Sequence, residues 1–144
     1  MYTTYSFLDL SGSIAHPVKG TFVFTGEGIG ELIVSMSTEK TAHDVAADGA
    51  VMVSKIPGNN GTLSIQCQQT SDLHKWLLEW YNYLMQADVS EWALTTSHLR
   101  NINDGTSHNI IGITPQKVPD KTYQAQGQKV TWVLMAADIS NMLG

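Results

Sequence analysis

Five histidines are the side chains best suited to metal binding or acid–base chemistry, because imidazole binds metals and exchanges protons near neutral pH. They are His16, His43, His74, His98 and His108. No two of them have the i, i+4 spacing of a helical metal site, and no Cys-x-x-Cys pair accompanies them. We therefore interpret them as surface or packed histidines and expect neither a metal nor another cofactor.

Other catalytic patterns have little support. Cys67 is the only cysteine, and its place on the apolar side of a predicted strand makes it a small buried hydrophobe. Residues 26–30 read Gly-Glu-Gly-Ile-Gly, but a phosphate loop needs a helix after its glycines, and here a strand follows. We predict a glycine-rich hairpin turn there and no enzyme activity. A Ser/His/Asp site stays open, since its members meet only in the fold.

Composition points to self-association. The 144 residues suit one domain, 1–144. Charged residues make up 15% of the chain, against about 25% in typical soluble domains, which suggests that partners cover much of the surface. A net charge of −5, with only eight Lys and Arg, argues against stable nucleic-acid binding. Neither a signal peptide nor a membrane-spanning run is visible, so no membrane association is expected.

One amphipathic helix is predicted after Thr70-Ser71-Asp72, whose oxygen-bearing side chains can cap free backbone N–H groups. Its apolar residues recur at i, i+3, i+4 and i+7 and form one stripe that would pack on a sheet. That predicted helix–sheet core consists of Leu73, Trp76, Leu77, Trp80 and Leu84. Trp92 and Trp132 lie on predicted strands, and we interpret all four tryptophans as core residues rather than a stacking platform.

Strands account for most of the remaining chain. Residues 50–56 and 62–68 are predicted to form a hairpin around a turn at 57–61, where Asn and Gly tolerate positive φ. Asp104-Gly105 predicts a second hairpin. Residues 38–49 and 116–126 are predicted loops, and residues 137–144 a short tail. The other predicted strands are 5–10, 19–25, 31–37, 91–99, 106–114 and 128–136.

This order of elements lacks the βαβα alternation of a parallel sheet. We expect a mainly β (α+β) fold, an antiparallel β-sandwich or half-barrel with the one helix packed on it. In the strand 62–68, Leu63, Ile65 and Cys67 alternate with polar residues, which gives one apolar and one uncharged polar face. The polar face holds Ser64, Gln66 and Gln68.

Several short runs carry a resemblance to a known family. They are Tyr5-Ser6-Phe7-Leu8-Asp9, Ala47-Asp48-Gly49, Asn59-Asn60-Gly61-Thr62 and the run Gln-Gln-Thr-Ser ending at Ser71. In this order and spacing they resemble the tail tube proteins of bacteriophages with contractile tails. The resemblance covers most of residues 5–86 and weakens from Glu91 onward.

The resemblance implies a structural virion protein with the tube fold that secretion-system tube proteins share. Six subunits would form a ring, their sheets joining edge to edge into one β-barrel, and the rings would stack into a tube. The implied partners are further copies, the sheath, tape-measure, tail terminator and baseplate proteins, and DNA would pass through the lumen at ejection. Assembly would take place in the bacterial host cytoplasm. The alternatives are a tube subunit of a contractile secretion system and, further off, a β-sandwich enzyme or ligand-binding protein.

Two sets of residues receive roles under this hypothesis. Ser64, Gln66 and Gln68 would line the lumen, where an uncharged surface does not hold DNA. The loop 38–49 would reach a neighbouring ring, and its charged and titratable residues would set the register between rings. These predicted inter-ring residues are Glu39, Lys40, His43, Asp44 and Asp48.

Overall fold

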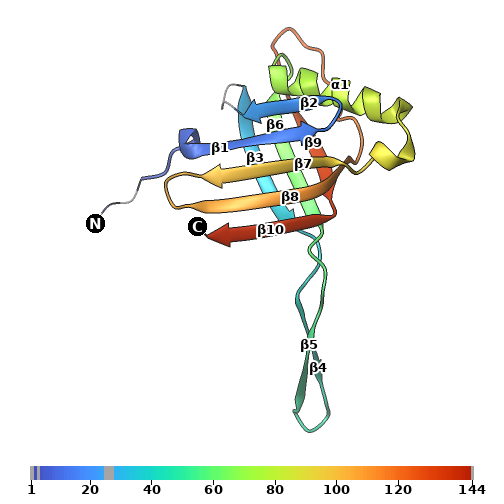
Figure 1. Cartoon of the computed structure of the whole chain (residues 1–144). Coiled ribbons are helices and arrows are strands. Elements are labelled where there is room, and N and C mark those ends of the chain that lie inside the picture. Colours follow the sequence, from blue (N-terminus) through green and yellow to red (C-terminus); the bar gives the residue numbers. More distant parts are fainter. Residues whose placement is uncertain (1, 3, 25–27, 144) are drawn as a thin grey trace.

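Antiparallel strands make up most of the regular secondary structure, and one α-helix lies at one end of them (Figure 1). The computed structural model describes residues 2, 4–24 and 28–143. The elements are η1 (Phe7–Asp9), β1 (Leu10–His16), β2 (Gly20–Phe24), β3 (Ile29–Met36), β4 (Thr41–Val45), β5 (Val51–Lys55), β6 (Gly61–Gln68), α1 (Asp72–Gln86), η2 (Val89–Glu91), β7 (Thr95–Asn101), β8 (Thr106–Pro115), β9 (Lys129–Ala136) and β10 (Asp138–Leu143).

The strands are arranged in two layers and a projecting hairpin. One layer has the order β2-β1-β7-β8, with β10 on the other side of β8, and the second has the order β9-β6-β3. The strands of the two layers cross at a steep angle (Figure 1). The hairpin β4–β5 pairs with neither layer and extends away from them. Every strand pair is antiparallel.

Strand β8 connects the two layers by bending at Gly112. It pairs with β10 as far as Ile111 and with β7 as far as Ile113, and then Thr114 and Pro115 pair with β9. Gly112 has a φ of 71°, and a Cβ built there would lie 2.6 Å from the Cβ of Ala137. Only glycine meets both the positive φ and the close approach, so this residue allows one strand to belong to both layers.

The hydrophobic core fills the space between the layers and under the helix. Every second side chain of the central strands points inward, as the strand period requires. In β6 these are Leu63, Ile65 and Cys67, all with 0% exposure. From the other elements the fully buried large residues are Ile14, Leu73, Leu77, Trp80, Leu84, Leu99, Ile110, Ile113, Trp132 and Leu134.

Helix α1 begins where the sequence predicts it. Ser71 is the N-cap, and its Oγ accepts a hydrogen bond from the His74 backbone N–H at 3.2 Å. Four members of the predicted helix–sheet core, Leu73, Leu77, Trp80 and Leu84, are buried. Trp76 is half-buried and stacks on Trp80 with ring centroids 6.2 Å apart, so it lies at the margin of the core.

The predicted fold class is confirmed: the chain is mainly β and antiparallel, with one α-helix packed on the sheets. The predicted pairing of residues 50–56 with 62–68 is wrong, because β5 pairs with β4 whereas β6 pairs with β3 and β9. The predicted loop 38–49 therefore contains β4 and the turn of the hairpin. The sequence of β4 shows no alternation of apolar and polar residues, because neither face of the hairpin packs on the core and neither face needs to be apolar.

Both ends of the chain also differ from the prediction. The sequence predicts a strand over residues 5–10, but η1 occupies Phe7–Asp9 and β1 continues through Gly12 to His16. Gly12 does not break the strand: a Cβ there would lie 2.4 Å from the His98 backbone oxygen, so glycine permits close packing. The expected tail 137–144 contains β10, which pairs with β8 and buries Ile139 in the core.

Smaller differences concern element boundaries. The strand predicted at 91–99 begins at Thr95, because η2 and a turn occupy the preceding residues. The hairpin predicted around residues 26–30 is wrong, because β2 pairs with β1 whereas β3 pairs with β6. Within this segment Gly26 and Glu27 lie outside the described residues, and Ile29 and Gly30 already belong to β3. The hairpin predicted at Asp104-Gly105 is confirmed by the pairing of β7 with β8.

Candidate assembly interface

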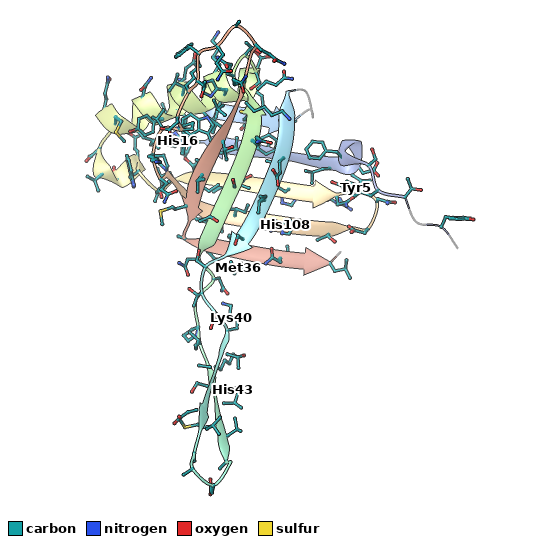
Figure 2. All side chains as sticks on the ribbon, turned by 180° about the vertical axis from the view of Figure 1, so that it is seen from behind. Tyr5, His16, Met36, Lys40, His43 and His108 are labelled. Carbon is teal, nitrogen blue, oxygen red and sulfur yellow. The ribbon has the colours of Figure 1, made fainter. Side chains whose placement is uncertain are left out.

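The hairpin β4–β5 is the first candidate interface. Its strands pair from Thr41 opposite Lys55 to Val45 opposite Val51. At its base the Lys40 ammonium donates to Asn59 Oδ1 at 2.6 Å, and the Ile56 N–H donates to the Lys40 carbonyl at 2.9 Å. Figure 2 shows Lys40 near the base and His43 further along the hairpin, both well away from the two layers.

The tip of the hairpin is a defined turn. The Gly49 N–H donates to the Ala46 carbonyl at 2.9 Å, and the Ala46 N–H donates to the Ala50 carbonyl at 2.8 Å. Asp48 Oδ1 accepts from the Ala50 N–H at 3.0 Å. Gly49 takes a φ of 90°, which glycine adopts without strain. These bonds give the segment a fixed end although the core does not support it.

The predicted inter-ring residues are distributed along the whole hairpin. Glu39 and Lys40 lie at its base, His43 and Asp44 are neighbours in β4 and so point to opposite faces, and Asp48 is at the tip. All five are exposed. The structure thus spreads these residues over both faces and does not gather them into one cluster.

Sequence reasoning missed the apolar side chains of the same hairpin. Val45, Val51, Met52 and Val53 are 64%, 52%, 61% and 63% exposed. Four large apolar side chains together on a projecting segment are typical of a surface that a partner covers. The signal was present in the run Val51-Met52-Val53, which is apolar on both faces of a strand whereas only one face can meet a core.

The outer face of β3, β6 and β9 is the second candidate interface. Ser64, Gln66 and Gln68 point to this face, opposite the buried Leu63, Ile65 and Cys67. Ser64 lies between Ile33 and Val133, and Gln66 lies between Glu31 and Thr131. Among the paired residues of this face that the structure describes, Glu31 and Lys129 are the only charged ones, so the face is close to neutral.

The edges of this layer are the third candidate interface. Strand β3 pairs only with β6. On the opposite side, β9 pairs with the end of β8 through Met135 and Leu134, and the Val133 carbonyl accepts from the Gln116 N–H at 3.3 Å. Among the described residues, the layer therefore presents unpaired backbone groups at both of its edges. Exposed strand edges of this kind readily pair with another chain.

The indole N–H groups of two buried tryptophans have hydrogen-bond partners inside the molecule. Trp80 Nε1 donates to Thr95 Oγ1 at 2.8 Å, and Trp132 Nε1 donates to His74 Nδ1 at 3.0 Å. His74 Nε2 is buried and has no hydrogen-bond partner. Burial, with a smaller effect of the Lys121 charge, lowers the pKa of His74, so its neutral form is favoured. Burial likewise raises the pKa of the Cys67 thiol and keeps it protonated.

Side chains that could bind a metal do not cluster in the described part of the chain. Three or more His, Cys, Asp or Glu side chains do not converge anywhere on a possible metal position. The His98 and His108 rings each lie 2.6 Å from an asparagine oxygen, of Asn109 and Asn141 respectively. None of the described helices is both long and apolar enough to cross a membrane.

Two crossed antiparallel layers with one helix and a projecting hairpin define a fold found in contractile injection systems. A chain in an extracellular contractile injection system, solved as the PVC sheath–tube complex in the extended state, is 11% identical with a TM-score of 0.60. It matches over 98% of this chain and 93% of its own length. A chain of the anti-feeding prophage baseplate is 12% identical with a TM-score of 0.65, over 99% and 97%. A chain of the PVC sheath/tube terminator is 10% identical with a TM-score of 0.60, over 99% and 98%.

The family follows from the sequence itself. The chain belongs to the family described as bacteriophage PhiTE tail tube protein, whose sequence profile matches residues 2–144. A comparison with curated protein sequences gives no match. The protein is therefore a structural tail tube protein, a component of the virion and not an enzyme. The resemblance stated from the sequence is confirmed.

Proposed function

We propose that the protein polymerises as stacked hexameric rings into the inner tail tube of a contractile-tail bacteriophage. Residues 1–144 act as a single tail-tube domain, and the tube is the conduit for DNA ejection. Membership of the phage tail tube family supports the tube, and the likeness to chains of contractile injection systems supports the contractile setting. The one observation that carries ring formation is the layer β9-β6-β3 with its two unpaired edges.

Joining these edges between copies completes the sheet. Strand β3 of one subunit lies beside β9 of the next, and their free N–H and C=O groups pair, as edge strands favour. The two edges differ, so the contact is heterologous and closes into a ring when its rotation permits. Repeated around the ring, the layer becomes the continuous β-barrel of the tube wall.

The outer face of the same layer then lines the lumen. Ser64, Gln66 and Gln68 form its central row, and Glu31 and Lys129 contribute one charge of each sign. A lumen with little positive charge does not retain phosphate groups, because stable DNA binding needs clustered cations. DNA passes such a surface without being held.

The β4–β5 hairpin connects one ring to the next. From its base to its tip it spans about 25 Å, at roughly 3.3 Å per strand residue, and its apolar residues become buried on the neighbouring ring. Glu39, Lys40, His43, Asp44 and Asp48 set the register of that contact. Charged groups around an apolar contact add specificity more than affinity.

The remaining partners follow from the position of the subunit in the tail. The sheath lies outside the tube, on the side of helix α1 that faces away from the layers, and the tape-measure protein lies inside during assembly. The tail terminator and the baseplate proteins bind the two ends of the tube. The protein assembles in the bacterial host cytoplasm and remains in the virion.

A tube subunit of a contractile secretion or injection system is the second candidate, favoured by the fold shared with extracellular contractile injection systems. The particle that contains the protein distinguishes the two functions. A DNA-filled head on the purified particle indicates a phage, whereas a headless particle indicates an injection system.

Purified protein tests the proposed assembly. We expect sedimentation velocity over a concentration series to show rings or longer species, and negative-stain microscopy to show stacked rings with sixfold symmetry. A chain that stays monomeric at the highest concentrations, or that forms only disordered aggregates, contradicts the proposal.

A further inference from the structure

An apolar groove lies at the C-terminal end of helix α1. It is lined by Leu84, Met85, Ala87, Val89 and Trp92, from the helix end and η2. Met85 is 49% exposed and Val89 is 87% exposed. Two carboxylates neighbour these lining residues in the sequence: Asp88 caps η2, and Glu91 accepts a hydrogen bond from Tyr83 at 2.8 Å. The groove thus combines an apolar floor with neighbouring acceptors.

The N-terminal arm, of which the structure describes Tyr2 and residues 4–6, carries two tyrosines that its own chain does not bury. Tyr2 is 100% exposed and Tyr5 is 76% exposed. The arm extends away from the two layers (Figure 1), and Asn103 Nδ2 donates to the Thr4 carbonyl at 3.0 Å near its base. Tyrosine is enriched at protein interfaces because its ring is apolar and its hydroxyl forms hydrogen bonds.

The arm and the groove lie at opposite ends of the same strand. The groove residue Trp92 comes just before the start of β7, whereas the last residue of β7, Asn101, pairs with Leu10 directly after η1, which follows the arm. In Figure 2, Tyr5 lies at one side of the molecule and His16, whose Nε2 is 3.3 Å from the Glu91 carbonyl, lies at the other. Strand β7 alone spans about 20 Å, so a subunit does not place its arm in its own groove.

In Figure 1 the N-terminal segment lies on the β3 side of the layer β9-β6-β3, and the C-terminal end of α1 lies on the β9 side. A heterologous ring closed through these two edges therefore brings the arm of one copy toward the groove of the next. We propose that the N-terminal arm of one subunit packs its tyrosines into the α1–η2 groove of the adjacent copy in the ring. The Tyr2 and Tyr5 rings cover Met85 and Val89, and the phenol hydroxyls donate to Asp88 and Glu91. This inference rests on the proposed ring, and it adds a second contact beside the joined sheet edges.

A disulfide experiment tests the contact directly. The variant Tyr5→Cys/Val89→Cys is assembled and oxidised, and the products are separated on a denaturing gel. We expect a ladder of covalent multimers, because the two cysteines meet only between copies. The matched control is Tyr5→Cys/Lys75→Cys, with an exposed position on α1 away from the groove, and it should stay monomeric on the gel. Native Cys67 is buried and does not compete.

The outcomes separate the two proposals. Rings without a ladder overturn the arm contact and leave the proposed function intact. A parent chain that forms no rings overturns the proposed function and, with it, the arm contact.

A second pair of variants keeps the test valid if the cysteine variants fail to fold. We expect Tyr2→Ser/Tyr5→Ser to need about tenfold more protein for ring formation, the effect of roughly 1.4 kcal/mol. Tyr123→Ser removes an equally exposed tyrosine, 79% exposed, from the loop before β9 and should assemble normally. Ring formation by Tyr2→Ser/Tyr5→Ser at the parent concentration contradicts the proposal and assigns the groove to another partner, such as the sheath.

Discussion

The layered body and the β4–β5 hairpin are built from the same kind of backbone pairing but differ in what surrounds it. Body strands such as β6 bury alternate side chains completely, whereas every residue of β4 and β5 is exposed. The body gains its stability from the hydrophobic core, and the hairpin has only its ladder and turn. An isolated two-stranded hairpin is marginal in water, which supports the proposal that contact with another copy completes this segment.

The largest expected effect is a difference in unfolding free energy between substitutions in the body and in the hairpin. Replacing the fully buried Trp80 with Ala should lower the free energy of unfolding by about 3–5 kcal/mol, through the lost burial and the cavity that remains. The matched change Val53→Ala in the hairpin should stay within about 0.5 kcal/mol, as for surface substitutions. Urea denaturation of both variants measures the difference. Equal losses would show that the hairpin shares the stability of the body.

Substitutions of Gly112 in the body and Gly49 in the hairpin compare the two regions at the next largest effect on stability. Gly112→Val should cost about 2–4 kcal/mol, because valine meets both a positive φ and a contact with Ala137 that is too close. Gly49 also has a positive φ, but a Cβ built there would have no atom within 4 Å. Gly49→Ala should therefore leave the melting temperature of the body unchanged. A large shift for Gly49→Ala would contradict the independence of the hairpin.

The histidines give a smaller, pH-dependent effect. Because the pKa of His74 is lowered in the folded chain, the unfolded chain binds a proton at His74 more readily than the folded chain does. Stability from this group is complete above the ordinary histidine pKa near 6.5 and is lost as pH falls below that value. The variant His74→Asn keeps an acceptor for Trp132 but does not titrate, so its melting temperature should fall less between about pH 7 and 5.

The control for this pH effect lies in the hairpin. His43 is exposed, and His43→Asn should keep the pH profile of the parent chain. A His74→Asn profile identical to the parent would assign the acid sensitivity to other groups.

The smallest effect on stability is expected from charge reversal in the hairpin. Glu39→Lys/Asp44→Lys changes two exposed residues, so the unfolding free energy should change by less than about 0.5 kcal/mol. Ring stacking, however, should fail, because like charges at a contact cost several kcal/mol. Negative-stain microscopy distinguishes single rings from tubes. Normal tubes from the double variant would remove these residues from the inter-ring contact.

The same contrast explains what the sequence predicted. Helix α1, with Ser71 as its cap and Trp80 in its stripe, and the alternation of β6 were predictable because core packing imposes a period on the residues. The hairpin strand β4 was missed because no core imposes a period on Thr41–Val45. Strand β10 was missed because its Ile139 contributes only a single inward apolar residue, and strand pairing depends on distant residues.

The candidate interfaces were likewise predictable only where core packing imposes a period on the residues. The polar side of β6 was visible because it alternates with a buried side. The exposed Val51, Met52 and Val53, by contrast, acquire a role only from the shape of the hairpin, and the free edges of β3 and β9 only from the topology. Local patterns do not contain this information.

Amide hydrogen exchange, compared between free subunits and assembled tubes, tests the central claim most directly. The β3 amides that are not hydrogen-bonded to β6 should exchange readily in the free subunit and become protected in the tube, together with those at the open edge of β9. Amides in the middle of β6 should be protected in both states. Equal exchange of the β3 edge in both states would contradict a wall formed by joined sheets.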